Sequence, residues 1–511
     1  MKKIILFTIC LTFVVGCTEN FDEINTNPSS VNRVEAGLLF NPLIQNPIRN
    51  YQRNINLYPD LFVQYWANTI SGFESPRYEY VDGWIGNQWR EFYTETLAEA
   101  NTLREWYGDE PSHVNALAVL EIWMCSEWAR MAQTYGDIPY FGTGLGVTEG
   151  VTFNTEKEIY YDLFDRLAAA VDAIDPSDAS QYNYSADQDL FFQGDLEKWK
   201  RFGNSVRLRL AIRLSNVDPT KGQAEAVAAI NAGVMQSNAD NVSIPIWATG
   251  FNDYLHKMAR EWDNIRISKT FTDLLYSEAG FEDPRAPQWL TYEAGSPLAD
   301  SGVFEGLING YDLVPESAID YATLNLESSY PGFSGDGARN LLYMPIMFYS
   351  EVLFIQAEAA LRGWTGGDAN ALYKAGIQAS MDLVGVDPAD ATAYIDAIPE
   401  LTGTNEQQLK QLITQKYIAN FPNGIESWVD FRRTDYPDIT LPIDGVSSNA
   451  SVAQGTWVKR IRYPNSVHDN EPDDILPAGR KTIAEDRMDI RLWWDTADTK
   501  TKSGGLMNSN F

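Results

Sequence analysis

The chain has 511 residues, with 39 Lys or Arg against 70 Asp or Glu and a formal net charge of −31. Binding to a phosphate backbone requires clustered Lys and Arg, so this composition argues against a nucleic-acid partner. Hydrophobic residues make up 44% of the chain, which excludes a disordered protein and allows a large core.

The N-terminus has the pattern of a secretory signal. Lys2 and Lys3 precede the largely apolar run from Ile4 to Val15, which is too short to span a bilayer. The run ends at Gly16 and Cys17, and small residues before a Cys resemble the bacterial lipobox. We therefore predict that residues 1–16 are removed, that Cys17 is lipidated, and that acyl chains anchor the protein.

The remaining cysteines leave no disulfide framework. Cys10 is lost with the signal, and Cys125 falls in an apolar helical run, where we predict an inert buried thiol. Residues 17–30 are predicted to form a tether, followed by a single domain over 31–511. Acidic residues soon after the lipidated Cys also resemble an export signal to the outer face of the cell.

Helical spacing dominates the body of the chain, and strand-like alternation is scarce. The helices are predicted in four pairs: 92–106 with 112–135, 157–174 with 195–216, 345–363 with 367–384, and 405–420 with 423–432. Pairs joined by turns indicate helical hairpins of the tetratricopeptide type. The predicted fold class is therefore mainly α, with long irregular loops and few short strands.

Three stretches are predicted to be irregular. The largest is a loop-rich insertion over 218–344, in which the clearest helix is near 264–278. An aromatic, loop-rich stretch covers 66–90, and the tail from 433 to 511 is punctuated by prolines. Long irregular stretches inside a domain are often functional.

Catalytic and metal chemistry have little support. His113, His256 and His468 are scattered without ligand-spaced partners, so we assign no metal ligand and no catalytic residue. The glycine run over 142–146 follows a helix and Pro139, a context that predicts a turn and no dinucleotide site. No carboxylate pair stands out for glycoside hydrolysis. We therefore expect a binding protein without cofactors, with a surface hydrolase as an alternative to be tested.

Aromatic residues in loops are the most informative signal. Rigid aromatic rings can stack on the apolar faces of sugar rings while amides and charged groups bond the hydroxyls. Several aromatics fall among Gly, Pro, Asn and charged residues, where packing in a core is less expected. The predicted ligand-binding residues are Trp66, Tyr78, Tyr80, Trp84, Trp262 and Trp289.

Five stretches, in an order that covers nearly the whole chain after the signal, resemble a known family. They are Phe21–Pro28, Tyr135–Tyr140, Trp199–Asn216, Ser350–Ala359 and Glu426–Arg433. The chain resembles the SusD/RagB-like nutrient-binding outer-membrane lipoproteins of Bacteroidetes, and its size is similar to the SusD-like branch. The physical roles of these stretches are expected to be structural.

The resemblance implies both a fold and a function. Such proteins carry four tetratricopeptide-like units and are not enzymes. They lie on the cell surface, anchored to the outer membrane, and act as a lid that delivers oligosaccharides to a SusC-like TonB-dependent transporter. Members of the RagB branch take peptides instead, and this alternative stays open. The binding aromatics of the family vary and are not transferred by motif.

The acidity of the chain favours a neutral glycan, because a strongly negative protein repels uronates and sulfates. A β-glucan such as laminarin is the specific candidate. Calcium has no recognisable ligand loop in this sequence.

Overall fold

A computed structural model describes residues 33–48, 52–70, 72–144, 151–245, 255, 257–310, 318–326, 343–470, 475–496 and 511. The predicted signal peptide and tether, with Cys10 and Cys17, lie outside these residues, as do Gly146 and His256. Cys125 is described, is fully buried and has no disulfide partner. Burial raises the pKa of its thiol to about 12, which agrees with the prediction of an inert thiol.

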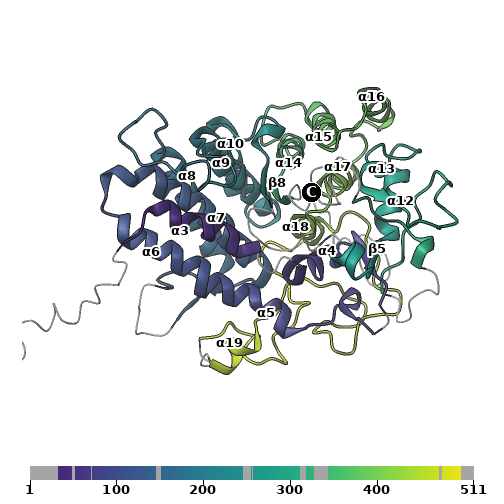
Figure 1. Cartoon of the computed structure of the whole chain (residues 1–511), viewed down its shortest axis with the longest axis horizontal. Coiled ribbons are helices and arrows are strands. Elements are labelled where there is room, and N and C mark those ends of the chain that lie inside the picture. Colours follow the sequence, from purple (N-terminus) through teal and green to yellow (C-terminus); the bar gives the residue numbers. More distant parts are fainter. Residues whose placement is uncertain are drawn as a thin grey trace, which may run out of the picture.

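Helices form most of the described structure (Figure 1). They are α3 (Ala36–Gln45), α4 (Pro59–Phe62), α5 (Asp82–Glu91), α6 (Leu97–Tyr107), α7 (Val114–Tyr135), α8 (Glu156–Ala173), α9 (Leu196–Arg213), α10 (Pro219–Ala232), α12 (Lys269–Ser277), α13 (Ala286–Trp289), α14 (Tyr349–Leu361), α15 (Ala369–Val384), α16 (Pro388–Ala397), α17 (Asn405–Asn420), α18 (Gly424–Thr434) and α19 (Asn465–Asn470). Three π-helical turns are η2 (Gln52–Asn56), η4 (Phe92–Thr96) and η9 (Lys257–Glu261).

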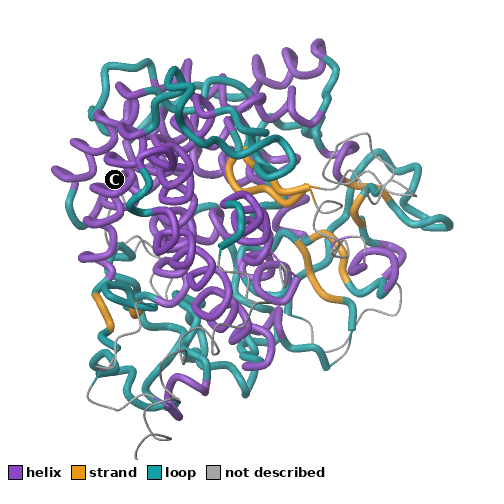
Figure 2. The backbone as a smooth tube through the Cα atoms, turned by 60° about the vertical axis from the view of Figure 1, so that its left-hand side comes forward, coloured by secondary structure: helices purple, strands orange, loops and turns teal. Residues whose placement is uncertain are grey.

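Strands are short and lie beside the helical body (Figure 2). They are β1 (Trp66–Asn68), β2 (Ile138–Pro139), β3 (Phe153–Asn154), β4 (Val242–Pro245), β5 (Ile265–Ile267), β6 (Leu290–Thr291), β7 (Thr323–Leu324) and β8 (Tyr343–Met347). Within the described residues they form antiparallel pairs: β1 with β5, β2 with β3, β4 with β8, and β6 with β7.

Capping residues define the helix ends that the sequence predicts best. Thr155 precedes α8 and accepts a hydrogen bond from the Glu158 amide, while the Glu158 carboxylate accepts one from the Thr155 amide. Thr404 and Gln407 form the same capping box at α17. Each box satisfies two backbone N–H groups that a helix N-terminus leaves without partners. As a result, α8 and α17 begin within one residue of their predicted starts.

The four predicted helix pairs are present and stack into a scaffold. In chain order they are α6 with α7, α8 with α9, α14 with α15, and α17 with α18. Neighbouring pairs also pack on one another, because α7 contacts α8 and α14 contacts α17. Figure 1 shows this body running from α6 and α8 on one side to α15 and α16 on the other. The mainly helical prediction is confirmed.

The predicted irregular stretches contain more helix than the sequence indicates. Residues 82–90 of the 66–90 stretch belong to α5, although Gly83 and Gly86 lower its helix propensity. Ile85 on α5 is buried in the core, so tertiary packing outweighs the propensity. The 218–344 stretch begins with α10, whose 14 residues pack along α9.

The helix predicted near 264–278 is a strand followed by a shorter helix. Ile265–Ile267 form β5, and β1 pairs with it so that Trp66 lies opposite Ile267. Ser268 then caps α12, with its hydroxyl accepting a hydrogen bond from the Thr270 amide. The hydroxyl cap marks the true start of this helix.

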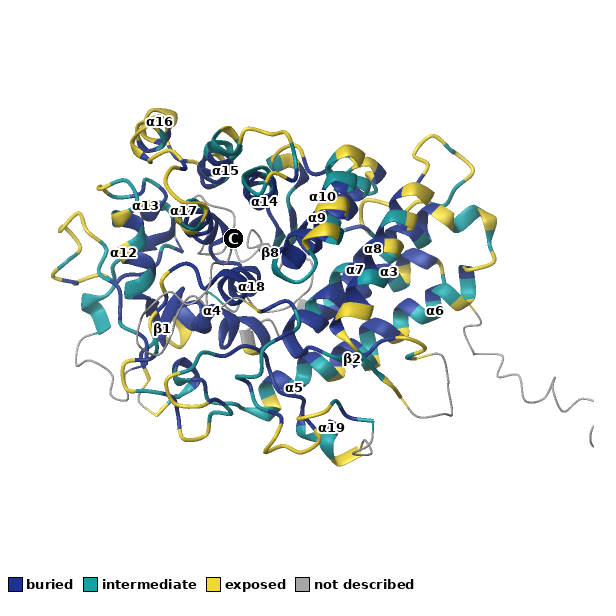
Figure 3. Cartoon of the chain, turned by 180° about the vertical axis from the view of Figure 1, so that it is seen from behind, coloured by how far each residue is buried: buried dark blue, intermediate teal, exposed yellow. Residues whose placement is uncertain are grey.

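A chain of buried ion pairs links four helices of the scaffold. Arg209 on α9 binds Glu351 on α14 at 2.6 Å, and Lys416 on α17 binds Asp430 on α18 at 2.7 Å. Arg433 on α18 completes the chain: it contacts Asp430 and forms a two-point ion pair with Glu358 on α14. Figure 3 shows α18 buried near the centre of the molecule, and the second half of α17 is buried as well. All of these acids and bases except Lys416 belong to stretches for which the sequence predicted structural roles.

The C-terminal tail is irregular, as predicted, except for α19, and it packs across α18. The guanidinium of Arg432 lies 3.5 Å from the Trp428 ring centroid and 4.9 Å from that of Trp494 in the tail. Arg432 also donates hydrogen bonds to the Gln133 and Lys459 carbonyls. Tail and scaffold therefore share one core. Among the described residues, no helix has the length and apolarity needed to cross a bilayer.

Candidate functional site

Three of the six predicted ligand-binding aromatics are core residues. Trp66 is fully buried, and its indole N–H donates to the Asn56 carbonyl at 3.0 Å. Tyr78 is buried and packs edge-on against Phe62. These rings have no open face for a sugar, so the prediction is wrong for them in this conformation.

Trp289 is buried as well, with 1% of its surface exposed. Its ring centroid lies 5.2 Å from that of Phe421 and 6.0 Å from that of Phe271. The preceding Asp283 and Arg285 form a fully buried ion pair at 2.5 Å, which draws the Pro-rich loop into the interior. The Pro and charged residues that precede Trp289 in the sequence therefore do not indicate that its ring is exposed.

Tyr80 is partly exposed, but its ring already contacts an arginine side chain. The guanidinium of Arg462 lies 3.7 Å from the ring centroid, in cation–π contact. The Tyr80 hydroxyl donates to Asp82 at 2.9 Å, and Asp82 also accepts the Asn465 amide at 2.8 Å. Tyr80 thus ties the start of α5 to the C-terminal tail. We expect it to support the site from behind.

Trp84 lies in the first turn of α5 and is only partly buried. Its ring stacks on Phe73, with centroids 5.5 Å apart and planes 27° apart. The exposed Arg53 places its guanidinium 5.9 Å from the Trp84 centroid. This stacked pair offers an aromatic surface with a cation beside it.

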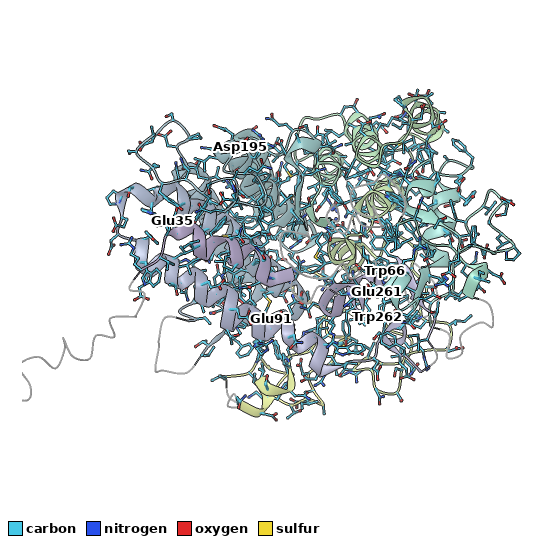
Figure 4. The ribbon with its side chains drawn as sticks, viewed as in Figure 1. Glu35, Trp66, Glu91, Asp195, Glu261 and Trp262 are labelled. Atoms are coloured by element: carbon cyan, nitrogen blue, oxygen red, sulfur yellow. The ribbon has the colours of Figure 1, made fainter. Side chains whose placement is uncertain are left out.

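Trp262 is the most exposed of the predicted aromatics, with 47% of its surface accessible. It follows η9, and the Lys257 ammonium lies 5.8 Å from its ring centroid. Figure 4 places Trp262 and Glu261 near the buried Trp66, in keeping with the pairing of β1 and β5.

One segment connects Trp262 with the Phe73–Trp84 stack. Directly after β1, the Thr69 amide donates to the Asn264 carbonyl, and the Thr69 hydroxyl donates to the Asp263 carbonyl at 3.0 Å. Four residues later, the Phe73 amide donates to the carbonyl of Ile70, which is 48% exposed. We group Ile70, Phe73, Trp84 and Trp262 as the aromatic strip, because the segment that hydrogen-bonds next to Trp262 leads within four residues to the Phe73–Trp84 stack.

Polar groups stand beside Trp262. Arg266 on β5 is buried and binds Asp263 at 2.6 Å and Glu293 at 2.8 Å, while its Nε donates to the Ala318 carbonyl. Burial, together with a hydrogen bond that the Glu293 carboxyl can donate to the Asp263 carboxylate, raises the pKa of Glu293. Both acids keep exposed surface, so they can accept hydrogen bonds from a hydroxylated ligand.

Sequence reasoning missed several members of this site. Phe73 follows Gly72 in the 66–90 stretch, from which the sequence analysis selected other aromatic residues. Arg53 lies in η2, a segment that has no recognisable motif. Tyr292 and Phe304 form a further stacked pair, 5.8 Å apart, next to Glu293. Their local sequence is typical of any surface loop, so only the tertiary structure brings them to notice.

The described histidines and the glycine run that the sequence analysis considered have structural roles. His113 stacks between Tyr107 and Tyr182, and His468 contacts the buried Asp486 at 3.1 Å. Gly142 and Gly144 both have positive φ in a turn after β2. In the part of the chain that the structure describes, no group of three or more His, Cys, Asp or Glu is arranged to hold a metal.

The family comparison agrees with the fold. The sequence model of the SusD-like family described as "Starch-binding associating with outer membrane" matches residues 28–464. The chain therefore belongs to the SusD-like family, as its sequence resemblance implied. No curated protein sequence gives a significant match.

Solved structures share the fold over most of their length. A chitin-binding SusD homologue from Flavobacterium johnsoniae is 26% identical, with a TM-score of 0.75, and the match covers 93% of this chain and 99% of that one. A SusD homologue from Parabacteroides distasonis is 25% identical, with a TM-score of 0.77, and the match covers 91% and 98%. The alignment thus spans nearly whole proteins on both sides.

Proposed function

We propose that the protein is a cell-surface lipoprotein that binds a neutral glycan at the aromatic strip. It then delivers the glycan to a SusC-like TonB-dependent transporter in the outer membrane. The observation that carries the binding site is the exposed Trp262, which lies directly before Asp263, one of two accessible carboxylates that Arg266 binds. The partly buried Phe73–Trp84 stack supplies a second aromatic surface. Flat rings next to hydrogen-bond acceptors suit a sugar, which has apolar faces and a rim of hydroxyls.

The net charge supports a neutral ligand, since −31 opposes an anionic glycan. Two neutral glycans are the leading candidates. Laminarin represents the β-glucans that the sequence favours, and chitin oligosaccharides enter because a 26% identical relative is described as chitin-binding. The family's description as starch-binding supports a binding role.

Replacing Trp262 with Ala, and separately Trp84, is expected to weaken glycan binding by about 1–3 kcal/mol each, by analogy with aromatic stacking on bases. Isothermal titration with laminarin and chitin oligosaccharides measures the change. Phe281→Ala is the matched control, because Phe281 is 43% exposed but packs against Tyr394 on α16. Unchanged affinity in both Trp variants would move the site elsewhere.

The same titration separates the alternatives. A mixture of short peptides is expected to give no heat, and binding of peptides without binding of any glycan would replace this proposal with a role of the RagB kind. Product analysis after incubation with each glycan is expected to show no cleavage. Turnover would instead indicate a surface hydrolase.

The membrane anchor rests on Cys17. Cys17→Ala is expected to release the protein from the outer-membrane fraction, because the acyl chains supply the anchoring. Fractionation and immunoblotting measure the shift, with Cys125→Ala as a control that stays in the membrane. Retention of the Cys17 variant would contradict lipidation at this residue. Co-purification of a TonB-dependent transporter with the membrane-bound protein tests the partner.

A further inference from the structure

A cleft lies in the helical scaffold, between α10 and the turn that joins α14 to α15. Its volume is about 590 Å³. Small-molecule sites typically have volumes of about 300–1,000 Å³, so the cleft is large enough for a ligand. We call it the scaffold cleft, and the residues that line it include Val227, Ile230, Asn231, Gln356, Trp364 and Leu372.

One part of the lining is apolar. Val227 and Ile230 on α10 and Leu372 on α15 line the cleft and are partly exposed. Trp364 from the turn is 9% exposed, and the far edge of its ring lies next to Gly222 on α10. A ligand with an apolar face can therefore cover hydrophobic surface that faces water in the free protein.

The other part of the lining is polar and nearly uncharged. Asn231 is exposed, and Gln356 and Thr365 are partly exposed, so their side chains can bond a ligand. Asp368 is the only charged residue among the described residues that line the cleft. Its Oδ1 caps α15 by accepting the Asn370 and Ala371 amides at 2.9 and 3.1 Å. This chemistry suits a neutral ligand that carries hydroxyl or amide groups and opposes an anion.

Gly366 brings main chain to the edge of the scaffold cleft. Its φ lies outside the left-handed region, and a Cβ at this position would meet no atom within 4 Å. Neither backbone conformation nor packing therefore requires glycine here. A glycine at such a position lets a ligand approach the backbone closely.

We propose that the scaffold cleft is a second binding site for a neutral oligosaccharide, separate from the aromatic strip. This inference rests on the proposed function, from which the class of ligand is taken. The apolar faces of the sugar rings pack on Val227, Ile230 and Leu372, and the hydroxyls bond Asn231 and Gln356.

The two sites lie on different sides of the molecule. In Figures 1 and 3, α10, α14 and α15 lie in the upper half, whereas α5, which carries Trp84, lies in the lower half. Figure 4 places Trp262 below these three helices as well. One short oligosaccharide therefore cannot fill both sites, and a saturated protein holds two of them.

Isothermal titration of the full-length protein with hexasaccharides of laminarin and of chitin tests the proposal. We expect two molecules of the better ligand per chain. Combining Asn231→Ala with Gln356→Ala is expected to reduce the number to one, because it removes the hydrogen-bonding groups of the cleft. Gly366→Trp, which places a large side chain at the edge of the cleft, is expected to have the same effect. Gln223→Ala, at another exposed amide on α10, is the control that keeps both molecules.

The pattern of losses separates this inference from the proposed function. One molecule per chain that is lost in Trp262→Ala and retained in the cleft variants would overturn the second site and leave the aromatic strip in place. One molecule per chain that is lost in the cleft variants and retained in Trp262→Ala would overturn the aromatic strip and support the scaffold cleft. No heat from either glycan would overturn both.

Discussion

Replacing Glu358 with Gln is expected to lower the free energy of unfolding by about 3–5 kcal/mol, because it removes the buried negative charge that Arg433 and Arg362 share. Glu358 is 1% exposed, and its two oxygens bind Arg433 at 2.6 and 2.7 Å. Its Oε1 also accepts Arg362 Nε at 2.9 Å. Urea denaturation at neutral pH measures the loss.

The same ion pair predicts that the stability of the folded protein falls at acidic pH. Burial alone would raise the pKa of Glu358, but Arg433 and Arg362 outweigh it and hold the pKa at about 2, below the ordinary 4.5. A carboxyl with a lowered folded-state pKa stabilises the protein above its unfolded pKa. This contribution is therefore lost as the pH falls from about 4.5 towards 2, and the Glu358→Gln variant should lose less stability over that range.

Asp438→Asn is the matched control for Glu358→Gln. Asp438 pairs with Lys410 at 2.5 Å, but both side chains are about half exposed. Solvent screens such a pair, so its loss is expected to change the unfolding free energy by less than about 1 kcal/mol. A Glu358→Gln variant as stable as this control would contradict the structural role of the buried pair.

Trp289→Ala is expected to reduce stability by about 3–5 kcal/mol, the usual loss for a buried aromatic. The ring fills the space between Phe271, Phe421 and Arg285, and Ala would leave a cavity among them. Urea denaturation and titration with glycan are measured on the same preparation. The folded fraction is expected to bind glycan as well as the unaltered protein.

Trp262→Ala is the control for Trp289→Ala, because we expect it to weaken glycan binding and to leave stability nearly unchanged. Its ring is half exposed, so its removal is expected to change stability by no more than about 0.5 kcal/mol while weakening glycan binding. A Trp289→Ala variant that stays fully stable but loses binding would restore Trp289 to the site. It would also show that the loop around it opens when ligand is present.

Helix prediction succeeded where local chemistry and periodicity agreed. The capping boxes at Thr155 and Thr404 define helix starts by hydrogen bonds within four residues, so they can be read directly from the sequence. It failed at α5 and β5. The glycines of α5 disfavour a helix locally, and the pairing of β5 with β1 joins residues nearly 200 positions apart, as in Trp66 opposite Ile267.

In the candidate site, too, some features could be predicted from the sequence and others only from the structure. The sequence drew attention to Trp84 and Trp262, which stay accessible, but equally to Trp66, Tyr78 and Trp289, which are buried. Gly, Pro and charged residues around a Trp indicate a turn. Such a turn can still be buried when residues from distant parts of the sequence bind its polar groups. The loop before Trp289 is an example, since Arg285 binds Asp283 in a completely buried ion pair and also donates hydrogen bonds to the distant Ser380 and Gln415.

The sequence alone determined the mainly helical scaffold, the family and the expectation of a lipidated N-terminus, because each depends on periodicity or on short local motifs. Only the tertiary structure decided which aromatics remain accessible and how the ion pairs of α9, α14, α17 and α18 connect. Burial and long-range pairing are properties of the packed chain, so residues such as Trp262 and Trp289 become distinguishable only when their neighbours are in place.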